Sequence, residues 1–192
     1  MTGSVIRPAA GMGEGEHGET VQVRSRIVVR PVLPEECAEA GRQTRAGFAA
    51  LFGEADAEYL DTVADVAARC DRTTVLVALD EEGYILGSIT VELATKLDPE
   101  QQLEPGEAHL RMLGVAPAAQ GRGAGRALLE GAAALARAAG KSRLTLRTLP
   151  EMTAARRLYD AMGFEGGPPE EHHGGRPHIS YELRLSPDQP AG

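Results

Sequence analysis

The fold is decided by the stretch QGRGAGR at Gln120–Arg126, which joins a predicted strand, Ala108–Val115, to a predicted helix, Gly123–Ala139. Apolar residues recur along one face of that helix. Glycines at this spacing let the backbone approach a ligand closely and take positive φ angles. The first amides of the helix have no partner within it and lie at the positive end of its dipole. The turn therefore suits a phosphate group, and a pyrophosphate best of all.

Two common phosphate-binding patterns do not fit this turn. A dinucleotide-binding GxGxxG motif would need glycine where Arg126 or Leu128 stands. A nucleotide triphosphate loop would end in Gly-Lys-Ser or Gly-Lys-Thr, which does not follow these glycines. The turn thus belongs to neither class of nucleotide site.

Outward from the turn, residues 108–149 form a strand-helix-strand unit, which requires two parallel strands joined by a right-handed crossover. The other strands read as antiparallel, so we expect an α/β fold: a central mixed β-sheet with helices on both faces. The expected strands are Arg26–Val32, Thr73–Leu79, Tyr84–Leu93, Ala108–Val115, Arg143–Leu149, a short one from Phe164, and Ile179–Leu185. The expected helices are Pro34–Thr44, Ala55–Arg69, Gly123–Ala139 and Pro150–Met162.

One domain, residues 26–185, is expected between two tails. Residues 1–25 are rich in glycine and poor in apolar side chains, so they cannot repay the entropy of ordering and are predicted to be flexible. Residues 186–192 form a short polar C-terminal tail.

Composition limits the function classes. The 192 residues hold 20 basic and 28 acidic side chains, a net charge of -8, which argues against nucleic acid as a partner. No apolar run approaches the ~20 residues of a membrane span, so no membrane partner is expected. Cys37 and Cys70 are read as buried small side chains rather than a disulfide, which favours a cytoplasmic location.

Two motifs together resemble the GNAT superfamily, the acyl-CoA-dependent N-acetyltransferases. The first is Gln-x-x-Gly-x-Gly at Gln120–Gly125, following the sequence LGVAP at Leu113–Pro117. The second, ARRLYDAMGF at Ala155–Phe164, matches the family's A-x-x-L-Y-x-x-x-G-F signature. The resemblance spans roughly Arg26 to Leu185 and implies acetyl-CoA as co-substrate and a GNAT-like sheet.

The resemblance also implies a coenzyme site. Backbone groups of Leu113 and Val115 would bind the pantetheine arm, and the turn would hold the pyrophosphate. The implied coenzyme-binding residues are Leu113, Val115, Gln120, Gly121, Arg122, Gly123, Ala124, Gly125 and Arg126. Met152 stands where the family often has asparagine, so that contact is not carried over.

Acetyl transfer needs a base to deprotonate the amine and an acid for the departing thiolate. Tyr159 occupies the position where the family commonly places the acid; alternatively it anchors the pantetheine by packing. The strand period places Glu107, His109 and Arg111 on one face. His109 stands where the family often has glutamate, so His109 or Glu107 is the expected base. A water chain, or a plain solvated strand face, is the alternative.

By resemblance, the acceptor pocket is built from residues 48–58 and 165–178. Its candidate side chains are Phe48, Phe52, Glu54, Asp56, Glu58, Glu165, Glu170, Glu171, His172, His173, Arg176 and His178. Carboxylates around an apolar floor would attract an amine; the alternative is that they are ordinary solvated loop charges. The spacing of the histidines does not fit a metal site, so no metal is expected.

The expected function is an N-acetyltransferase that moves an acetyl group from acetyl-CoA to a primary amine of a small molecule or peptide, by direct attack of the amine. The alternatives are a non-catalytic acyl-CoA-binding module and a protein or peptide N-acetyltransferase. Members of the family are often dimers, so a homodimer is the partner that the resemblance suggests.

Overall fold

The computed structural model describes residues 26–52, 57–94, 97, 102–171 and 176–186. The tails expected at 1–25 and, except for Ser186, at 186–192 lie outside these residues. The strands are β1 (Val28–Pro31), β2 (Thr74–Leu79), β3 (Ile85–Glu92), β4 (Glu107–Val115), β5 (Arg143–Thr148), β6 (Glu165–Glu171) and β7 (Pro177–Arg184). The helices are η1 (Pro34–Glu36), α1 (Cys37–Phe52), α2 (Ala57–Ala64), α3 (Ala67–Cys70), η2 (Pro117–Ala119), α4 (Ala124–Ala138) and α5 (Thr153–Ala161).

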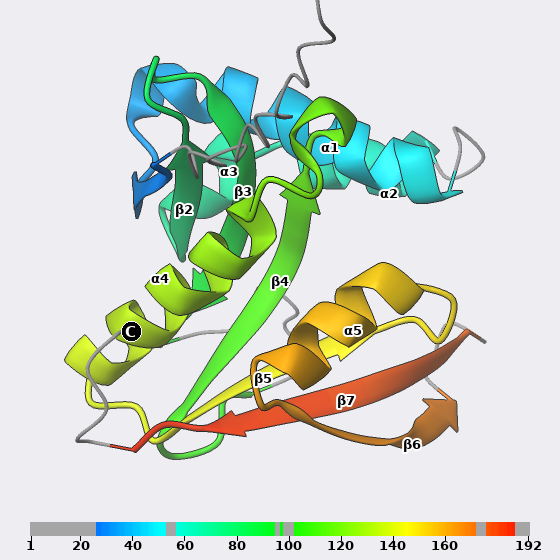
Figure 1. The fold of residues 1–192 in the computed structure, drawn as a ribbon. Coiled ribbons are helices and arrows are strands. Elements are labelled where there is room, and N and C mark those ends of the chain that lie inside the picture. The colour runs from blue at the N-terminus through cyan, green and yellow to red at the C-terminus, as the bar shows by residue number, and fades with distance from the viewer. Residues whose placement is uncertain (1–25, 53–56, 95–96, 98–101, 172–175, 187–192) are drawn as a thin grey trace, which may run out of the picture.

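The described strands form one mixed sheet in the order β1-β2-β3-β4-β5-β7-β6. β4 and β5 are parallel and joined through α4, whereas every other neighbouring pair is antiparallel. The expected α/β class, mixed sheet and strand-helix-strand unit are therefore confirmed (Figure 1).

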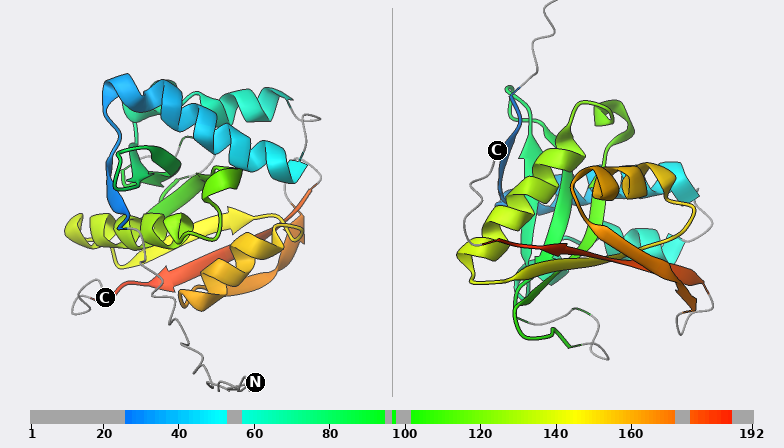
Figure 2. Two further views of the ribbon diagram at one scale, coloured as in Figure 1. Left: turned by 45° about the horizontal axis from the view of Figure 1, so that its top comes forward. Right: turned by 60° about the horizontal axis from the view of Figure 1, so that its bottom comes forward.

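Helices cover both faces of the sheet, as expected. α4 and α5 lie on one face, and α1 and α2 lie on the other (Figure 2). The larger core packs α4 against the sheet through side chains such as Leu128, Ile89 and Leu144, all fully buried. A second cluster lies under α1 and includes Val75 and Val77 of β2. This burial fixes both helix layers against β4, the strand on which the site is built.

The helix expected at Ala55–Arg69 is two helices, α2 and α3, over its described residues. The break is stabilised by Arg69, which is 4% exposed. Its guanidinium donates hydrogen bonds to the carbonyls of Thr62, Val63 and Asp65, at 3.1, 3.0 and 2.7 Å. These carbonyls lie at the end of α2, where helical partners run out. The helical spacing of apolar residues carries no signal for this capping of α2 by the Arg69 side chain.

The strand expected to be short after Phe164 extends through β6, Glu165–Glu171. β7 also begins at Pro177, two residues earlier than expected. β6 is exposed throughout, lies at the sheet edge and pairs with β7. An edge strand tolerates proline, and the pairing shifts register between Gly166 and Pro169. Cross-strand pairing thus overrides the local glycine and proline signals.

α1 lies directly on β4 because two glycines remove the side chains between them. A Cβ on Gly47 would come within 2.6 Å of the Val115 carbonyl oxygen, and one on Gly114 within 2.7 Å of Thr44 Cγ2. Distances this short would force the helix and strand apart. The close contact brings the end of α1 beside the end of β4.

Cys37 and Cys70 are free thiols with their sulfur atoms 3.9 Å apart; Cys37 is buried as expected, whereas Cys70 is only half-buried. Burial, followed by the neighbouring Cys37, raises the pKa of the Cys70 thiol to about 11. Among the described helices, none combines the length and apolar character that a membrane span requires.

Candidate active site

The sheet opens between its two parallel strands. β4 and β5 pair only from Glu107↔Arg143 to Leu110↔Leu146. Beyond that point β4 stays paired with β3 and β5 stays paired with β7, so the two strands diverge (Figure 1). Backbone groups along the rest of β4 thus face a gap and not a neighbouring strand. An extended ligand could pair with them there as a strand would.

A β-bulge in β4 lies at this opening. Ser88 pairs with Gly114 and Thr90 with Arg111, so Ile89 alone opposes two residues of β4. One of those two, Met112, has a φ of 53°, which is uncommon for a residue other than glycine. Bulges bend a strand and re-aim its side chains. Here the bulge lies just past the last β4–β5 pair, Leu110↔Leu146.

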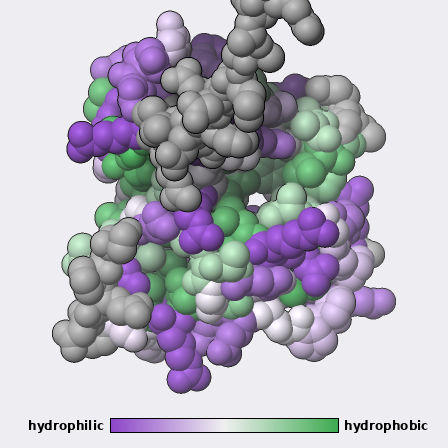
Figure 3. All heavy atoms as spheres, viewed as in Figure 1, coloured by the Kyte–Doolittle hydropathy of each residue, from purple (hydrophilic) through white to green (hydrophobic). Residues whose placement is uncertain are grey.

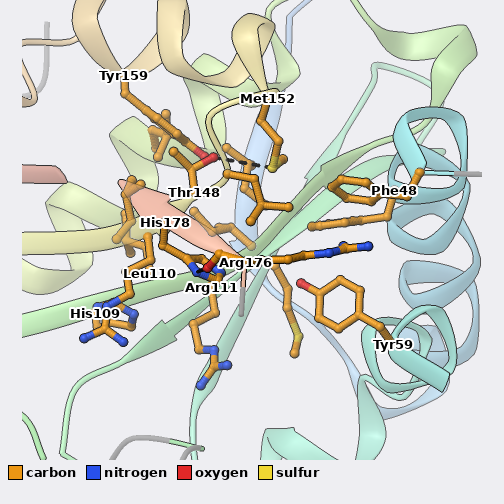
Figure 4. Close-up of a pocket in the computed structure, with 18 residues that line it drawn as sticks. Phe48, Tyr59, His109, Leu110, Arg111, Thr148, Met152, Tyr159, Arg176 and His178 are labelled. Atoms are coloured by element: carbon orange, nitrogen blue, oxygen red, sulfur yellow. Dashed lines mark hydrogen bonds between the residues drawn. The ribbon is translucent and has the colours of Figure 1, made fainter. Parts of the chain in front are cut away.

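A cavity of about 320 Å³ occupies the opening. The space-filling view shows a hollow between the α1–α2 layer and α5, bordered largely by hydrophobic residues (Figure 3). The close-up shows side chains converging on it from both layers and from the sheet (Figure 4). Its lining residues are Phe48, Phe52, Tyr59, Ile89, His109, Leu110, Arg111, Met112, Leu113, Leu129, Leu146, Arg147, Thr148, Leu149, Met152, Tyr159, Arg176 and His178.

The glycine-rich turn leads into α4 next to this opening. Gly121 and Gly123 have φ angles of 77° and 96°, conformations that glycine adopts without strain. Gly123 is the N-cap of α4, and no described side chain caps the helix. Gly125 lies against Leu158 of α5, since a Cβ on it would be 3.1 Å from Leu158 Cδ2. The first amides of α4 are thus placed to bind an anion beside the contact between α4 and α5.

Basic side chains flank the turn. Arg122 lies 3.6 Å from Asp80, and Arg126 lies 3.8 Å from Glu130. Gln120 donates a hydrogen bond of 3.4 Å to the Val115 carbonyl and so ties the turn to the end of β4. Both arginines are substantially exposed, whereas Asp80 is buried, so only the Arg126–Glu130 pair is a weak surface ion pair.

Tyr159 projects from α5 toward the cavity, and its ring is 5% exposed (Figure 4). The ring packs against Phe164 and Tyr181, with centroids 5.8 and 5.5 Å away. Burial, together with Tyr181, raises the pKa of the Tyr159 phenol well above its usual value. The hydroxyl is therefore protonated throughout the physiological pH range and can donate a hydrogen bond into the cavity.

His109 and Glu107 are connected through a residue of β5. Thr145 donates its hydroxyl proton to Glu107 Oε1 at 2.6 Å. A hydroxyl has one proton, so Thr145 Oγ1 must accept the 2.7 Å hydrogen bond from His109 Nδ1. Neutral His109 consequently carries its proton on Nδ1, and Nε2 is the nitrogen that can accept one.

The hydrogen-bonded chain of His109, Thr145 and Glu107 also joins two openings. His109 lines the central cavity and, with Glu107 and Thr145, a polar groove on the face of the sheet opposite α5. Both His109 and Glu107 are buried, at 6% and 4% exposure. A proton taken up in the cavity thus has hydrogen-bonded groups leading toward the groove.

The expected acceptor residues divide among different surfaces. Phe48, Phe52, Arg176 and His178 line the cavity. Glu58 lines a neighbouring groove, Glu165 lines the groove behind His109, and Glu170 and Glu171 are exposed on β6. The remaining expected residues, Glu54, Asp56, His172 and His173, lie outside the described residues. Among the described residues the cavity lining holds arginine and histidine but no carboxylate, and the expectation for Glu54 and Asp56 stays a prediction.

Several lining residues were missed by sequence reasoning. Thr148 donates a 3.4 Å hydrogen bond to the sulfur of Met152, the N-cap residue of α5. Tyr59 reaches the cavity from α2 and packs edge-on against Phe48, with centroids 5.9 Å apart. Their positions follow from how distant segments pack, and the local pattern carries no signal for that. Across the described residues, no group of three or more His, Cys, Asp or Glu is arranged to hold a metal ion.

Comparison with known proteins gives one family match and many similar structures. The model of the acetyltransferase (GNAT) family matches residues 42–164, more than half of the chain. A search of curated proteins finds none that matches this chain. A protein assigned to the GNAT family from Desulfovibrio desulfuricans has a TM-score of 0.65 and 22% identity, covering 84% of this chain and all of that one. A GNAT acetyltransferase from Brucella melitensis, solved with acetyl-CoA, has a TM-score of 0.58 and 24% identity over 88% and 94% of the two chains. The PaiA N-acetyltransferase from Thermoplasma acidophilum, solved with coenzyme A, has a TM-score of 0.61 and 14% identity over 82% and 99%.

Proposed function

The chain belongs to the acetyltransferase (GNAT) family, and on this premise we propose that it transfers an acetyl group from acetyl-CoA to a primary amine of a small molecule or peptide. The observation that carries the proposal is the opening between β4 and β5. It has the glycine-rich turn beside it, Tyr159 on one wall and His109 on the other. The structures solved with acetyl-CoA or coenzyme A support the choice of co-substrate.

The residues present suit acetyl-CoA. The amides of Gly121–Gly125 and the positive end of α4 would bind the pyrophosphate, with Arg122 and Arg126 adding positive charge. Backbone groups of Leu113 and Val115, which β5 leaves unpaired, would hydrogen-bond the pantetheine arm. The thioester would then lie in the cavity near Tyr159.

His109 is the proposed base. An ammonium group has no lone pair, so it must lose a proton before attacking the thioester carbonyl. Nε2 of His109 takes that proton, directly or through a water in the cavity. The bond from Nδ1 to Thr145, supported in turn by Glu107, holds the ring in the required tautomer. Glu107 is therefore a positioning residue: it accepts the Thr145 hydroxyl proton, and its carboxylate lies 3.8 Å from Nδ1.

Tyr159 is the proposed acid. After the amine attacks, the tetrahedral intermediate collapses and the C–S bond breaks to leave a thiolate. The Tyr159 hydroxyl, kept protonated by its buried position, donates to the sulfur as negative charge develops there. The direct transfer forms one amide bond and releases coenzyme A, without an acetylated enzyme.

The experiment is a thiol-release assay with acetyl-CoA against a panel of amines, amino acids, polyamines, aminoglycosides and peptides. We expect release with at least one class of amine, together with acetylated product identified by mass spectrometry. Calorimetry with acetyl-CoA separates the enzyme from a non-catalytic binding module. Tight coenzyme binding with no turnover on any amine would favour the module, and turnover confined to proteins would favour a protein acetyltransferase.

A further inference from the structure

The charges around the acceptor side of the cavity point to a narrower substrate class. We propose that the acceptor is an amine that also carries a carboxylate and an apolar side chain, as an apolar amino acid does, and that Arg176 binds the carboxylate. The inference rests on the proposed function, because it assigns the second substrate of that reaction. It follows from the composition of the cavity wall, the reach of Arg176 and the aromatic floor beside it.

The cavity wall is cationic although the protein is acidic. Arg111, Arg147 and Arg176 line it, whereas none of its described lining residues is an aspartate or glutamate. The chain as a whole has a net charge of -8. Positive side chains gathered in a cleft of such a protein concentrate anions there and disfavour substrates that carry only positive charge.

Arg176 is the arginine best placed for this role. Arg111 also borders the acidic groove along α2. Arg147 is shared with the polar groove behind His109. Arg176, just before β7, borders only the central cavity among the grooves described and extends across it toward Phe48 and Tyr59 (Figure 4). A guanidinium presents paired N–H donors that match the two oxygens of a carboxylate.

The surface that faces Arg176 is aromatic. Phe48 contacts Phe52 and Tyr59, with ring centroids 6.2 and 5.9 Å apart. Such a floor removes an apolar side chain from water and offers it aromatic edges and faces. The cavity, about 320 Å³, lies at the small end of ligand pockets. A small molecule that carries all three groups can therefore place its amine near the thioester, bind Arg176 through its carboxylate and pack its apolar group on the aromatic residues.

The test compares three probes that share one ring and one amine. L-Phenylalanine carries the carboxylate, L-phenylalaninamide replaces it with a neutral amide, and phenethylamine lacks it. We expect kcat/KM for phenylalanine to exceed that for phenethylamine by at least about tenfold, as for the loss of a charged hydrogen bond. L-Leucine should behave like phenylalanine. Equal or higher kcat/KM for phenethylamine would overturn the inference while leaving acetyl transfer itself established.

Variants of Arg176 assign the effect to the residue. Arg176→Gln should lower kcat/KM for phenylalanine about tenfold, chiefly through KM, and change that for phenethylamine less than about twofold. Arg176→Lys should recover part of the loss. Arg184→Gln removes the same charge from a side chain that is 91% exposed on β7, so it should leave both substrates unaffected. An equal loss for both substrates in Arg176→Gln would contradict carboxylate recognition.

Calorimetry keeps the inference separate from the proposed function. If the wild type acetylates none of the panel, the proposed function fails. Binding of phenylalanine to the wild-type protein in the presence of coenzyme A, weakened at least about fivefold by Arg176→Gln, would still support the arginine site. Absence of phenylalanine binding, or equal binding by both proteins, would overturn it.

Discussion

Replacing Tyr159 with phenylalanine removes the hydroxyl proposed to protonate or hydrogen-bond the leaving thiolate, and little else. The ring keeps its contacts with Phe164 and Tyr181, at centroid distances of 5.8 and 5.5 Å. No cavity larger than an oxygen atom is created. We therefore expect the free energy of unfolding to change by no more than about 1 kcal/mol, and acetyl-CoA affinity to stay within about twofold.

The size of the rate loss follows from the burial of the phenol. Burial raises the pKa of Tyr159 above the ordinary value of about 10, whereas a typical thiol has a pKa of about 8.5. The phenol is thus a weaker acid than the thiol product, so its contribution as the acid is at least that of a hydrogen bond to the developing thiolate. A hydrogen bond to a charged group contributes about 1.5–3 kcal/mol. That range corresponds to about a 10- to 150-fold loss of kcat.

The assay is steady-state thiol release at saturating acetyl-CoA, with coenzyme affinity measured by calorimetry. Tyr181→Phe is the matched control, because it makes the same chemical change in a buried ring next to Tyr159. Its hydroxyl accepts a hydrogen bond from Arg156 at 3.3 Å and does not line the central cavity. We expect its kcat to change less than about threefold. A Tyr159→Phe enzyme within about threefold of wild type would refute the role assigned to the hydroxyl.

Three further predictions concern pH and reactivity. Removing the proposed base with His109→Ala should lower kcat/KM by at least about 100-fold and abolish the rise of kcat/KM with pH. Glu107→Gln should lower kcat/KM less. Losses of kcat/KM below about threefold in both variants would assign the role of the base to water. Arg30 hydrogen-bonds Glu36 and lowers the pKa of that carboxyl to about 2, so Glu36→Gln should destabilise the protein by about 1 kcal/mol at neutral pH. The lowered pKa of Glu36 stabilises the folded protein fully only when the pH is above the carboxyl's ordinary pKa of about 4.5. The difference in free energy of unfolding between wild type and Glu36→Gln, measured with urea, should therefore vanish as pH falls from about 4.5 toward 2. A difference that does not change with pH would contradict this. Cys70, with its pKa raised to about 11, should react with a disulfide reagent near pH 8 far more slowly in the folded protein than in urea, and equal rates would contradict its burial.

The local signals of the sequence were sufficient for the central unit of the fold. The glycine turn, the apolar face of α4 and the β-branched strands indicated β4, α4 and β5 to within a few residues. The parallel pair then followed from the right-handed crossover rule. Tyr159, His109 and Leu113 line one cavity, so the motif positions and the strand period located side chains that the structure brings together.

What sequence reasoning missed depends on contacts between distant segments. Thr145 links His109 to Glu107 because β5 pairs with β4 in one particular register, and register cannot be read from either strand alone. The bulge at Met112 and the cationic cavity wall likewise arise from the way β3, β4 and the start of β7 meet. The domain limits, a homodimer and a cytoplasmic location stay predictions.

The central claim is that acetyl-CoA enters between β4 and β5 and presents its thioester to Tyr159. A crystal structure of the protein with acetyl-CoA tests it most directly. We predict the pyrophosphate on the amides of Gly121–Gly125, the pantetheine arm paired with the backbone of β4, and the thioester sulfur within about 3.5 Å of the Tyr159 hydroxyl. A coenzyme bound outside the opening, or a thioester on the far side of the sheet from Tyr159, would contradict the account.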